Sequence, residues 1–251
     1  MHSPRSVLVT GASKGIGLQL CKEFLKNHEI VHVIAACRHP DGAEELNQIE
    51  DGRLTIVQMD VTKDDQIQRA YAIIDKIVGE EGLNMLVNNA GIFLDYETDQ
   101  SPDRGVLLQQ LNTNVVSLAV VSQTFIPLLK RAAMKEGGKS VSPFKASIIN
   151  ITSGLGSMGL QTTGSWPKKS FAYRMSKAAV NSLTKTMSFD LTDSHILVVA
   201  LCPGWCQTDM GGPEATQTVE DSVSKMVPTI YKLDGQHNGS FIQHTGNELK
   251  Y

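Results

Sequence analysis

The sequence contains few cysteines and no pattern of residues typical of a metal site. Its four cysteines, Cys21, Cys37, Cys202 and Cys206, are scattered along 251 residues, and three of them fall in apolar or strand-like stretches. This favours reduced, buried thiols over a disulfide framework, although Cys202 and Cys206 bracket Pro203-Gly204 and a redox pair is the alternative there. The seven histidines are dispersed without the spacing of metal ligands, so we expect no metal.

The chain also lacks a strong excess of charge and a long apolar run. A formal net charge of −3 gives no electrostatic basis for binding nucleic acid or an anionic membrane surface. The apolar stretch at residues 196–202 is far too short to cross a bilayer. Residues 1–14 contain no apolar signal core followed by a small-residue cleavage site. We therefore expect a cytoplasmic protein that binds neither nucleic acid nor membrane.

Short apolar runs alternate with longer helical patterns along the whole chain. Hydrophobic residues make up 41% of it, enough for a proper core, and no linker divides it, so residues 1–251 are expected to form a single domain. The runs lack strict alternation, as strands covered on both faces do, and lie at residues 6–10, 31–37, 54–59, 85–88, 146–151, 197–201 and 240–243. Helical patterns lie at residues 15–27, 64–78, 105–130 and 171–190. This order predicts an α/β fold with a doubly wound parallel sheet of about seven strands, a Rossmann fold.

A glycine-rich loop, TGASKGIG, lies at Thr10 to Gly17 between the first expected strand and the first expected helix. Glycines let the backbone approach phosphate groups, and the N-terminus of a helix offers free N–H groups to them. The expected ligand is therefore the pyrophosphate of a dinucleotide, and a tight turn without a ligand is the alternative. The candidate cofactor-binding residues here are Gly11, Ser13, Lys14, Gly15, Ile16 and Gly17.

A second group of residues has the spacing that proton transfer requires. Tyr173 and Lys177 are four residues apart in a helical pattern, so their side chains lie next to each other on one face. A phenol has a pKa of about 10, and a neighbouring ammonium stabilises its ionised form. Ser153 follows the expected strand at residues 146–151 and could donate a hydrogen bond to a substrate oxygen, with a capping role as the alternative.

Taken together, the G-x-x-x-G-x-G spacing, the Tyr173-x-x-x-Lys177 pair and the motifs between them resemble the short-chain dehydrogenase/reductase family over residues 6–210. The resemblance implies hydride transfer from a nicotinamide cofactor to a carbonyl carbon, with Tyr173 protonating the oxygen. It also implies that Asn114 holds a water linking the lysine to solvent. The implied catalytic residues are Asn114, Ser153, Tyr173 and Lys177.

The same resemblance implies further contacts with the cofactor and a preference for NADP(H). Where members that prefer NAD place an acid, this chain has Cys37 followed by Arg38. Arg38 and Lys14 favour a 2′-phosphate through charge-assisted contacts, with ordinary solvated charges as the alternative. The further cofactor residues that the resemblance implies are Asp60, Val61, Asn88, Ala90, Gly91, Tyr173, Lys177, Pro203, Gly204 and Thr208.

Two extended segments, residues 131–145 and 155–171, and the closing GSFIQHTGNELKY resemble the sniffer-like and C-factor-like branch of the family. Sniffer-type members are carbonyl reductases, whereas the C-factor name comes from cell signalling. We therefore expect an NADP(H)-dependent carbonyl reductase acting on a ketone, aldehyde or quinone. The alternative is a dinucleotide-binding signalling or scaffold protein that needs no turnover.

Two further features bear on the substrate and on assembly. Trp205, Met210 and the Gly211-Gly212-Pro213 stretch predict a mobile, partly apolar substrate flap at about residues 205–226. The helices expected at residues 105–130 and 171–190 are apolar on more than one face. An exposed apolar face of that size is rare on a monomer, so a homodimer or homotetramer is expected.

Overall fold

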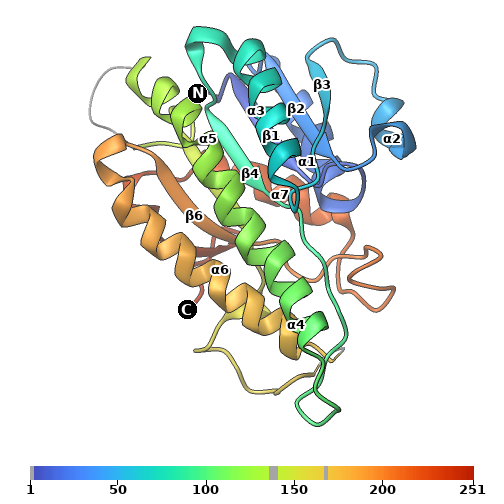
Figure 1. The fold of residues 1–251 in the computed structure, drawn as a ribbon. Coiled ribbons are helices and arrows are strands. Elements are labelled where there is room, and N and C mark those ends of the chain that lie inside the picture. The colour runs from blue at the N-terminus through green and yellow to red at the C-terminus, as the bar shows by residue number, and fades with distance from the viewer. Residues whose placement is uncertain (1–2, 136–140, 167–168) are drawn as a thin grey trace.

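Across residues 3–135, 141–166 and 169–251, which the computed structural model describes, the centre of the fold is a parallel sheet of seven strands (Figure 1). Their order is β3-β2-β1-β4-β5-β6-β7, and every neighbouring pair is parallel. The strands are β1 (Ser6–Thr10), β2 (His32–Cys37), β3 (Leu54–Gln58), β4 (Met85–Asn88), β5 (Ser147–Ile151), β6 (Leu197–Cys202) and β7 (Phe241–Gln243). The doubly wound Rossmann fold is thus confirmed, and each expected strand is present with its ends shifted by at most one residue.

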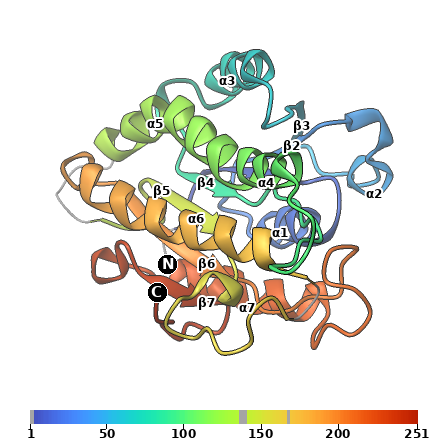
Figure 2. The same ribbon diagram turned by 60° about the horizontal axis from the view of Figure 1, so that its bottom comes forward.

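Helices cover both faces of this sheet (Figures 1 and 2). They are α1 (Gly15–Leu25), α2 (Glu44–Asn47), α3 (Asp64–Val78), α4 (Arg104–Leu111), α5 (Ser117–Lys135), α6 (Phe171–Asp190) and α7 (Val219–Tyr231). A π-helical turn at Asn112–Val116 joins α4 to α5, so the helix expected at residues 105–130 consists of two helices around a widened turn.

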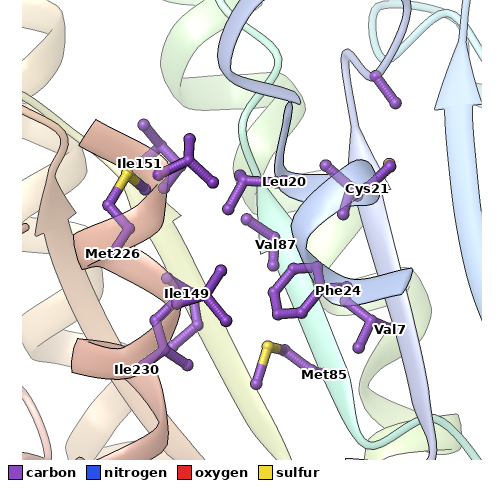
Figure 3. Packing of buried hydrophobic residues seen from close by; sticks show 14 of the residues in the cluster. Val7, Leu20, Cys21, Phe24, Met85, Val87, Ile149, Ile151, Met226 and Ile230 are labelled. Atoms are coloured by element: carbon purple, nitrogen blue, oxygen red, sulfur yellow. The ribbon is translucent and has the colours of Figure 1, made fainter. Parts of the chain in front are cut away.

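Side chains of each strand alternate between two apolar cores. In β1, Val7 and Val9 face the core under α1 and α7, whereas Leu8 faces the core under α3 and α5. Figure 3 shows the first of these cores, where Phe24 of α1 and Ile230 of α7 converge on the sheet. Because both faces are buried, the strands read as continuous apolar runs, which explains why they could be identified from the sequence.

Helix α7 was not expected, and it shortens the candidate flap. Thr218 caps the helix by accepting a hydrogen bond from the Asp221 N–H at 3.0 Å. Val223 and Met226 are fully buried beneath it. Residues 219–226 therefore belong to a core helix and not to the expected flap, and a flap at residues 205–218 stays a prediction.

The helical run Arg104–Lys135 is, within the described residues, the one segment long and apolar enough to cross a membrane by length and composition, with a mean hydropathy of 1.3. Of the most apolar 18-residue stretch within this run, 44% is buried, because Val121, Phe125 and Leu128 pack against the sheet. Core helices of sheet proteins pass the same test. The run is therefore a helix of the fold that packs one side against the sheet and leaves another side exposed.

The two extended segments are only partly described. Residues 136–140 of the first, with Gly137-Gly138, and Pro167-Lys168 of the second lie outside the described residues.

Candidate active site

The predicted site residues follow strand ends at one edge of the sheet, because parallel strands all end on the same side. They are Gly11, Ser13, Lys14, Gly15, Ile16 and Gly17 after β1, Arg38 after β2, Asp60 and Val61 after β3, Asn88, Ala90 and Gly91 at the end of β4, Ser153 after β5, and Pro203, Gly204 and Thr208 after β6. Helices supply the remaining three, Asn114, Tyr173 and Lys177.

The glycine loop leaves no room for side chains at two of its positions. A Cβ at Gly11, where φ is +65°, would lie 2.8 Å from the Cα of Ala90. A Cβ at Gly17 would lie 2.3 Å from the Gly11 carbonyl oxygen. Helix α1 begins directly after Lys14 with no side-chain cap and no acid in its first turn. The loop is therefore a close-packed turn that presents the positive end of a helix, which suits an anionic group.

Asn89 fixes this loop and was missed by the sequence reasoning, which named its neighbours in the NNAG motif. Its side-chain amide donates hydrogen bonds to the carbonyl oxygens of Thr10 at 2.9 Å and Gly11 at 3.2 Å. In return, the Thr10 hydroxyl accepts from the backbone N–H groups of Asn89 and Ala90, each at 3.0 Å. The end of β4 therefore holds the glycine loop in place.

The side chain of Asn88 does not contact the glycine loop but points into the interior of the fold. Its side-chain amide donates to the Ser122 hydroxyl and to Asn150 Oδ1, each at 2.9 Å, and it is buried. This side chain links β4 to β5 and α5 inside the fold, so any contact that Asn88 makes with a cofactor involves its backbone.

Arg38 and Asp60 lie close together after β2 and β3. Burial opposes the ionised form of Asp60, but hydrogen bonds from the Thr62 backbone at 2.9 Å and hydroxyl at 2.8 Å outweigh it. With the nearby Arg38 and Lys63 cations, they lower the pKa of Asp60 below its usual value. The Arg38 side chain is exposed at this edge, and Cys37 before it is buried.

Lys14 is less available than the sequence suggested. Its ammonium forms an ion pair with Asp209 at 2.5 Å, which joins the glycine loop to the segment at residues 205–218. Both side chains are strongly exposed, so this contact is weak in water. A 2′-phosphate would compete with Asp209 for Lys14, whereas Arg38 is not in that ion pair.

Tyr173 and Lys177 are adjacent and buried on α6. The Lys177 ammonium lies 5.5 Å from the centre of the Tyr173 ring and donates a hydrogen bond to the Ile151 carbonyl oxygen at 2.8 Å. Burial lowers the pKa of Lys177 to about 8. Burial also raises the pKa of Tyr173, and the neighbouring Cys202 thiol adds to this, while a hydrogen bond from Ser153 opposes it.

Ser153 and Cys202 meet at the ends of β5 and β6. The Ser153 hydroxyl accepts a hydrogen bond from the Leu155 N–H at 3.1 Å, so this serine also caps the short turn that follows it. The Gly154 N–H donates to the Cys202 sulfur at 3.1 Å. All four cysteines are free and buried, and Cys202 lies close to Tyr173 and Lys177, a position that sequence reasoning did not assign to it.

Asn114 lies in the π-helical turn with its side chain fully engaged. Its oxygen accepts from the Ile92 N–H at 2.8 Å, and its amide donates to the Ile92 carbonyl oxygen and to the Ser176 hydroxyl, each at 3.0 Å. Asn114 therefore ties the loop after β4 to α6. Its role in holding a water stays a prediction.

The segment after β6 reaches back to the glycine loop. Gly204 has φ +79°, and a Cβ there would lie 2.1 Å from Gln217 Nε2. A Cβ at Gly15 would lie 3.4 Å from the Thr208 methyl group, so the two loops are in near contact. Pro203 to Thr208 thus closes one side of the site.

Comparison with known proteins decides the family, since residues 5–218 match the family described as short chain dehydrogenase. The chain belongs to the short-chain dehydrogenase family. It is therefore an oxidoreductase acting on C=O and CH–OH groups.

Individual family members agree with the branch that the loops indicated. The structure of the carbonyl reductase Sniffer of D. melanogaster is 35% identical, covers 99% of this chain and 100% of its own, and superimposes with a TM-score of 0.94. The NADPH-bound carbonyl reductase from chicken fatty liver is 36% identical, covers 100% and 96%, and has a TM-score of 0.95. C-signal of Myxococcus xanthus is 32% identical over 67% of this chain and 93% of its own.

Proposed function

We propose that this short-chain dehydrogenase is an NADP(H)-dependent carbonyl reductase that acts on a ketone, an aldehyde or a quinone, with Tyr173 as the general acid. The observation that carries the proposal is the grouping of Tyr173, Lys177 and Ser153 at the sheet edge that also holds the glycine loop. A chain that only bound a dinucleotide would need the loop without these three side chains.

The residues present fit an NADP(H) molecule. The turn at Gly11 and Gly17 is packed too closely for a Cβ, and it leads into the uncapped start of α1, which suits the pyrophosphate. Arg38 supplies an exposed guanidinium for the 2′-phosphate. When bound, NADPH supplies the hydride that adds to the carbonyl carbon. The NADPH found in the chicken relative supports this choice of cofactor.

In this proposal, Tyr173, Ser153 and Lys177 each have a separate role in the reaction at the carbonyl oxygen. Like any phenol, Tyr173 keeps its proton at neutral pH, so it is available to donate it as the oxygen gains charge. Ser153 hydrogen bonds at the same phenol and can donate to the same oxygen, which fixes the carbonyl. With a pKa of about 8, Lys177 is mostly charged at pH 7 and stabilises the phenolate that Tyr173 leaves behind.

The decisive experiment is NADPH oxidation by wild type and Tyr173→Phe, with one aldehyde, one ketone and one quinone. The substitution removes the transferable proton and little volume, so turnover should fall by about two to four orders of magnitude while NADPH affinity stays within about twofold. Tyr71→Phe is the control, because Tyr71 packs at a tilt against Phe125, with ring centres 5.8 Å apart, beside the core under α3, and this variant should retain activity. Substantial turnover by Tyr173→Phe would assign the acid to another group.

A signalling or scaffold role is the second candidate, favoured by the likeness to C-signal. It requires the dinucleotide but no turnover. A wild-type protein that binds NADPH tightly and reduces none of the three carbonyls would favour this role over the reductase.

We also propose that the protein is a homodimer or homotetramer built on α4, α5 and α6. These helices lie side by side on one face of the molecule (Figure 1). Leu108 of α4, Val116 of the π-helical turn and Phe189 of α6 are 58%, 51% and 70% exposed, so the described parts of the extended segments leave these side chains uncovered. Sedimentation equilibrium at micromolar concentration should give a multiple of 27.3 kDa, and a single species at that mass would refute the proposal.

We also propose that the protein is located in the cytoplasm. Four free, buried thiols are typical of a reducing compartment. Fractionation of cells expressing the tagged chain should recover it with soluble proteins, and recovery with membranes would contradict this location.

A further inference from the structure

Arg174, the residue after Tyr173, donates hydrogen bonds from its guanidinium to several residues of one segment of the chain. Its acceptors are oxygens of Ser170 at 3.0 Å, Thr163 at 2.8 Å, Trp166 at 2.7 Å and Leu155 at 3.5 Å. All four belong to the stretch that connects Ser153 to Tyr173. One side chain therefore spans the part of the chain that runs between two of the proposed catalytic residues.

These acceptors are hydroxyl and carbonyl oxygens, none of them a carboxylate. The guanidinium is partly buried, and this burial lowers the pKa of Arg174. A planar group with five N–H donors on three nitrogens can bind acceptors that lie apart, whereas the three donors of a lysine ammonium start from a single nitrogen. The contacts thus depend on the shape of the arginine rather than on its charge alone.

The segment is fixed at each end by other contacts. At its start, the Gly159 N–H donates to the Tyr251 carbonyl oxygen at 2.8 Å. At its end, the Tyr96 N–H donates to the Lys169 carbonyl oxygen at 2.8 Å, and the Phe171 N–H donates to the Tyr96 carbonyl oxygen at 3.0 Å. Arg174 holds the part between these two anchors.

Packing beneath this middle part is incomplete. A hollow of about 400 Å³ opens there, lined among others by Gln161, Gly164, Phe171 and Met175. Above it, Trp166 is 69% exposed. Because Trp166 buries little of its surface, the hydrogen bonds to Arg174 contribute much of what holds this middle part in place.

We propose that Arg174 is a positioning residue for the substrate. It holds residues 155–166 and Ser170 as a fixed wall beside Ser153 and Tyr173, and in this way sets the affinity for the carbonyl compound without touching the reacting atoms. A bulky substrate reaches farther along this wall than a small one and depends on it more. This inference rests on the proposed reductase function.

The test compares Arg174→Met and Arg174→Lys with Arg69→Met. Arg69 is a matched control, because it is an exposed arginine on α3 whose partner Asp65 lies one turn away. Hydrogen exchange of the amides in residues 160–166 should become about tenfold faster in Arg174→Met and less so in Arg174→Lys. With NADPH and 9,10-phenanthrenequinone, KM should rise about fivefold or more in Arg174→Met, with kcat within about twofold.

KM, kcat, the Kd of NADPH and hydrogen exchange together distinguish a positioning role of Arg174 from a role in cofactor binding or in catalysis. A small aldehyde, pyridine-4-carbaldehyde, should show a smaller rise in KM, and the Kd of NADPH should not change. Faster exchange with an unchanged KM for the quinone would overturn the proposal, as would a fall in kcat alone, which would mean that Arg174 acts on Tyr173. Unchanged exchange would show that Arg174 does not hold the segment.

Thr163→Ala provides a second variant that removes one acceptor from an exposed position, in case Arg174→Met does not fold. It should shift exchange and KM in the same direction by smaller factors, and no shift in either would count against the proposal. Failure of wild type to reduce any carbonyl would overturn the reductase function itself. Exchange would still report whether Arg174 orders the segment, so the two failures can be told apart.

Discussion

Replacing Lys177 with methionine should make the cofactor-free protein more stable at neutral pH, although it removes a residue needed for the proposed catalysis. The Lys177 ammonium is buried, and burial lowers its pKa from 10.5 to about 8. Since each pH unit is worth about 1.4 kcal/mol, the charged form costs about 3 kcal/mol of folding stability. Methionine avoids this cost, but it leaves the Ile151 carbonyl oxygen without the hydrogen bond at 2.8 Å, a loss of about 1 kcal/mol. The expected net gain at pH 7 is about 2 kcal/mol.

The dependence of this gain on pH follows from the direction of the pKa change. The folded protein releases the Lys177 proton near pH 8, whereas the unfolded chain keeps it until near 10.5. Between these values the unfolded state binds more protons at Lys177, so the unfavourable contribution of Lys177 to stability shrinks as pH rises, and the advantage of the methionine variant falls to about zero by pH 9.5.

Urea unfolding at pH 7 and pH 9.5 measures this change, and Lys185→Met, which removes an exposed lysine from the same helix, is the control. A methionine variant that is less stable than wild type at pH 7, or a difference that does not vary with pH, would refute the reasoning.

Three further predictions concern the cofactor edge. Arg38→Ala should weaken NADPH binding by about ten- to a hundredfold and NADH binding little, since a charge-assisted contact is worth about 1.5–3 kcal/mol. Lys14→Ala should weaken NADPH binding less. Equal affinities of wild type for NADPH and NADH would contradict this prediction. Gly17→Ala places a Cβ 2.3 Å from the Gly11 carbonyl oxygen, so Kd for NADPH should rise at least tenfold, by about 1.4 kcal/mol, and an unchanged Kd would mean that the loop adapts freely. Asn89→Ala removes two hydrogen bonds to the glycine loop and should lower the free energy of unfolding in urea by about 1–2 kcal/mol, whereas no loss would show that β4 does not hold the loop.

Features encoded by neighbouring residues could be predicted from the sequence. The strands of this sheet are buried on both faces, so each reads as a short apolar run between turns. The spacing of four residues between Tyr173 and Lys177 placed the two side chains together, because helix geometry alone fixes that distance.

Helix α7 shows where local composition was misleading. The run Gly211-Gly212-Pro213 before it and Pro228 within it are typical of a loop, and they drew the flap boundary too far along the chain. The signal that could have found the helix was Thr218 followed three residues later by Asp221, with apolar residues at helical spacing behind it.

The sequence by itself determined the seven strands, most of the helices, the glycine loop and the adjacent positions of Tyr173 and Lys177, because these depend on side chains a few positions apart. Tertiary structure decided which of two adjacent asparagines supports the loop, that Lys14 is paired with Asp209, and that Arg174 holds a segment beside Ser153. It also set the pKa of Tyr173 and Lys177 through burial. Such properties arise from groups far apart in the chain and from the exclusion of water, and neither is encoded in local spacing.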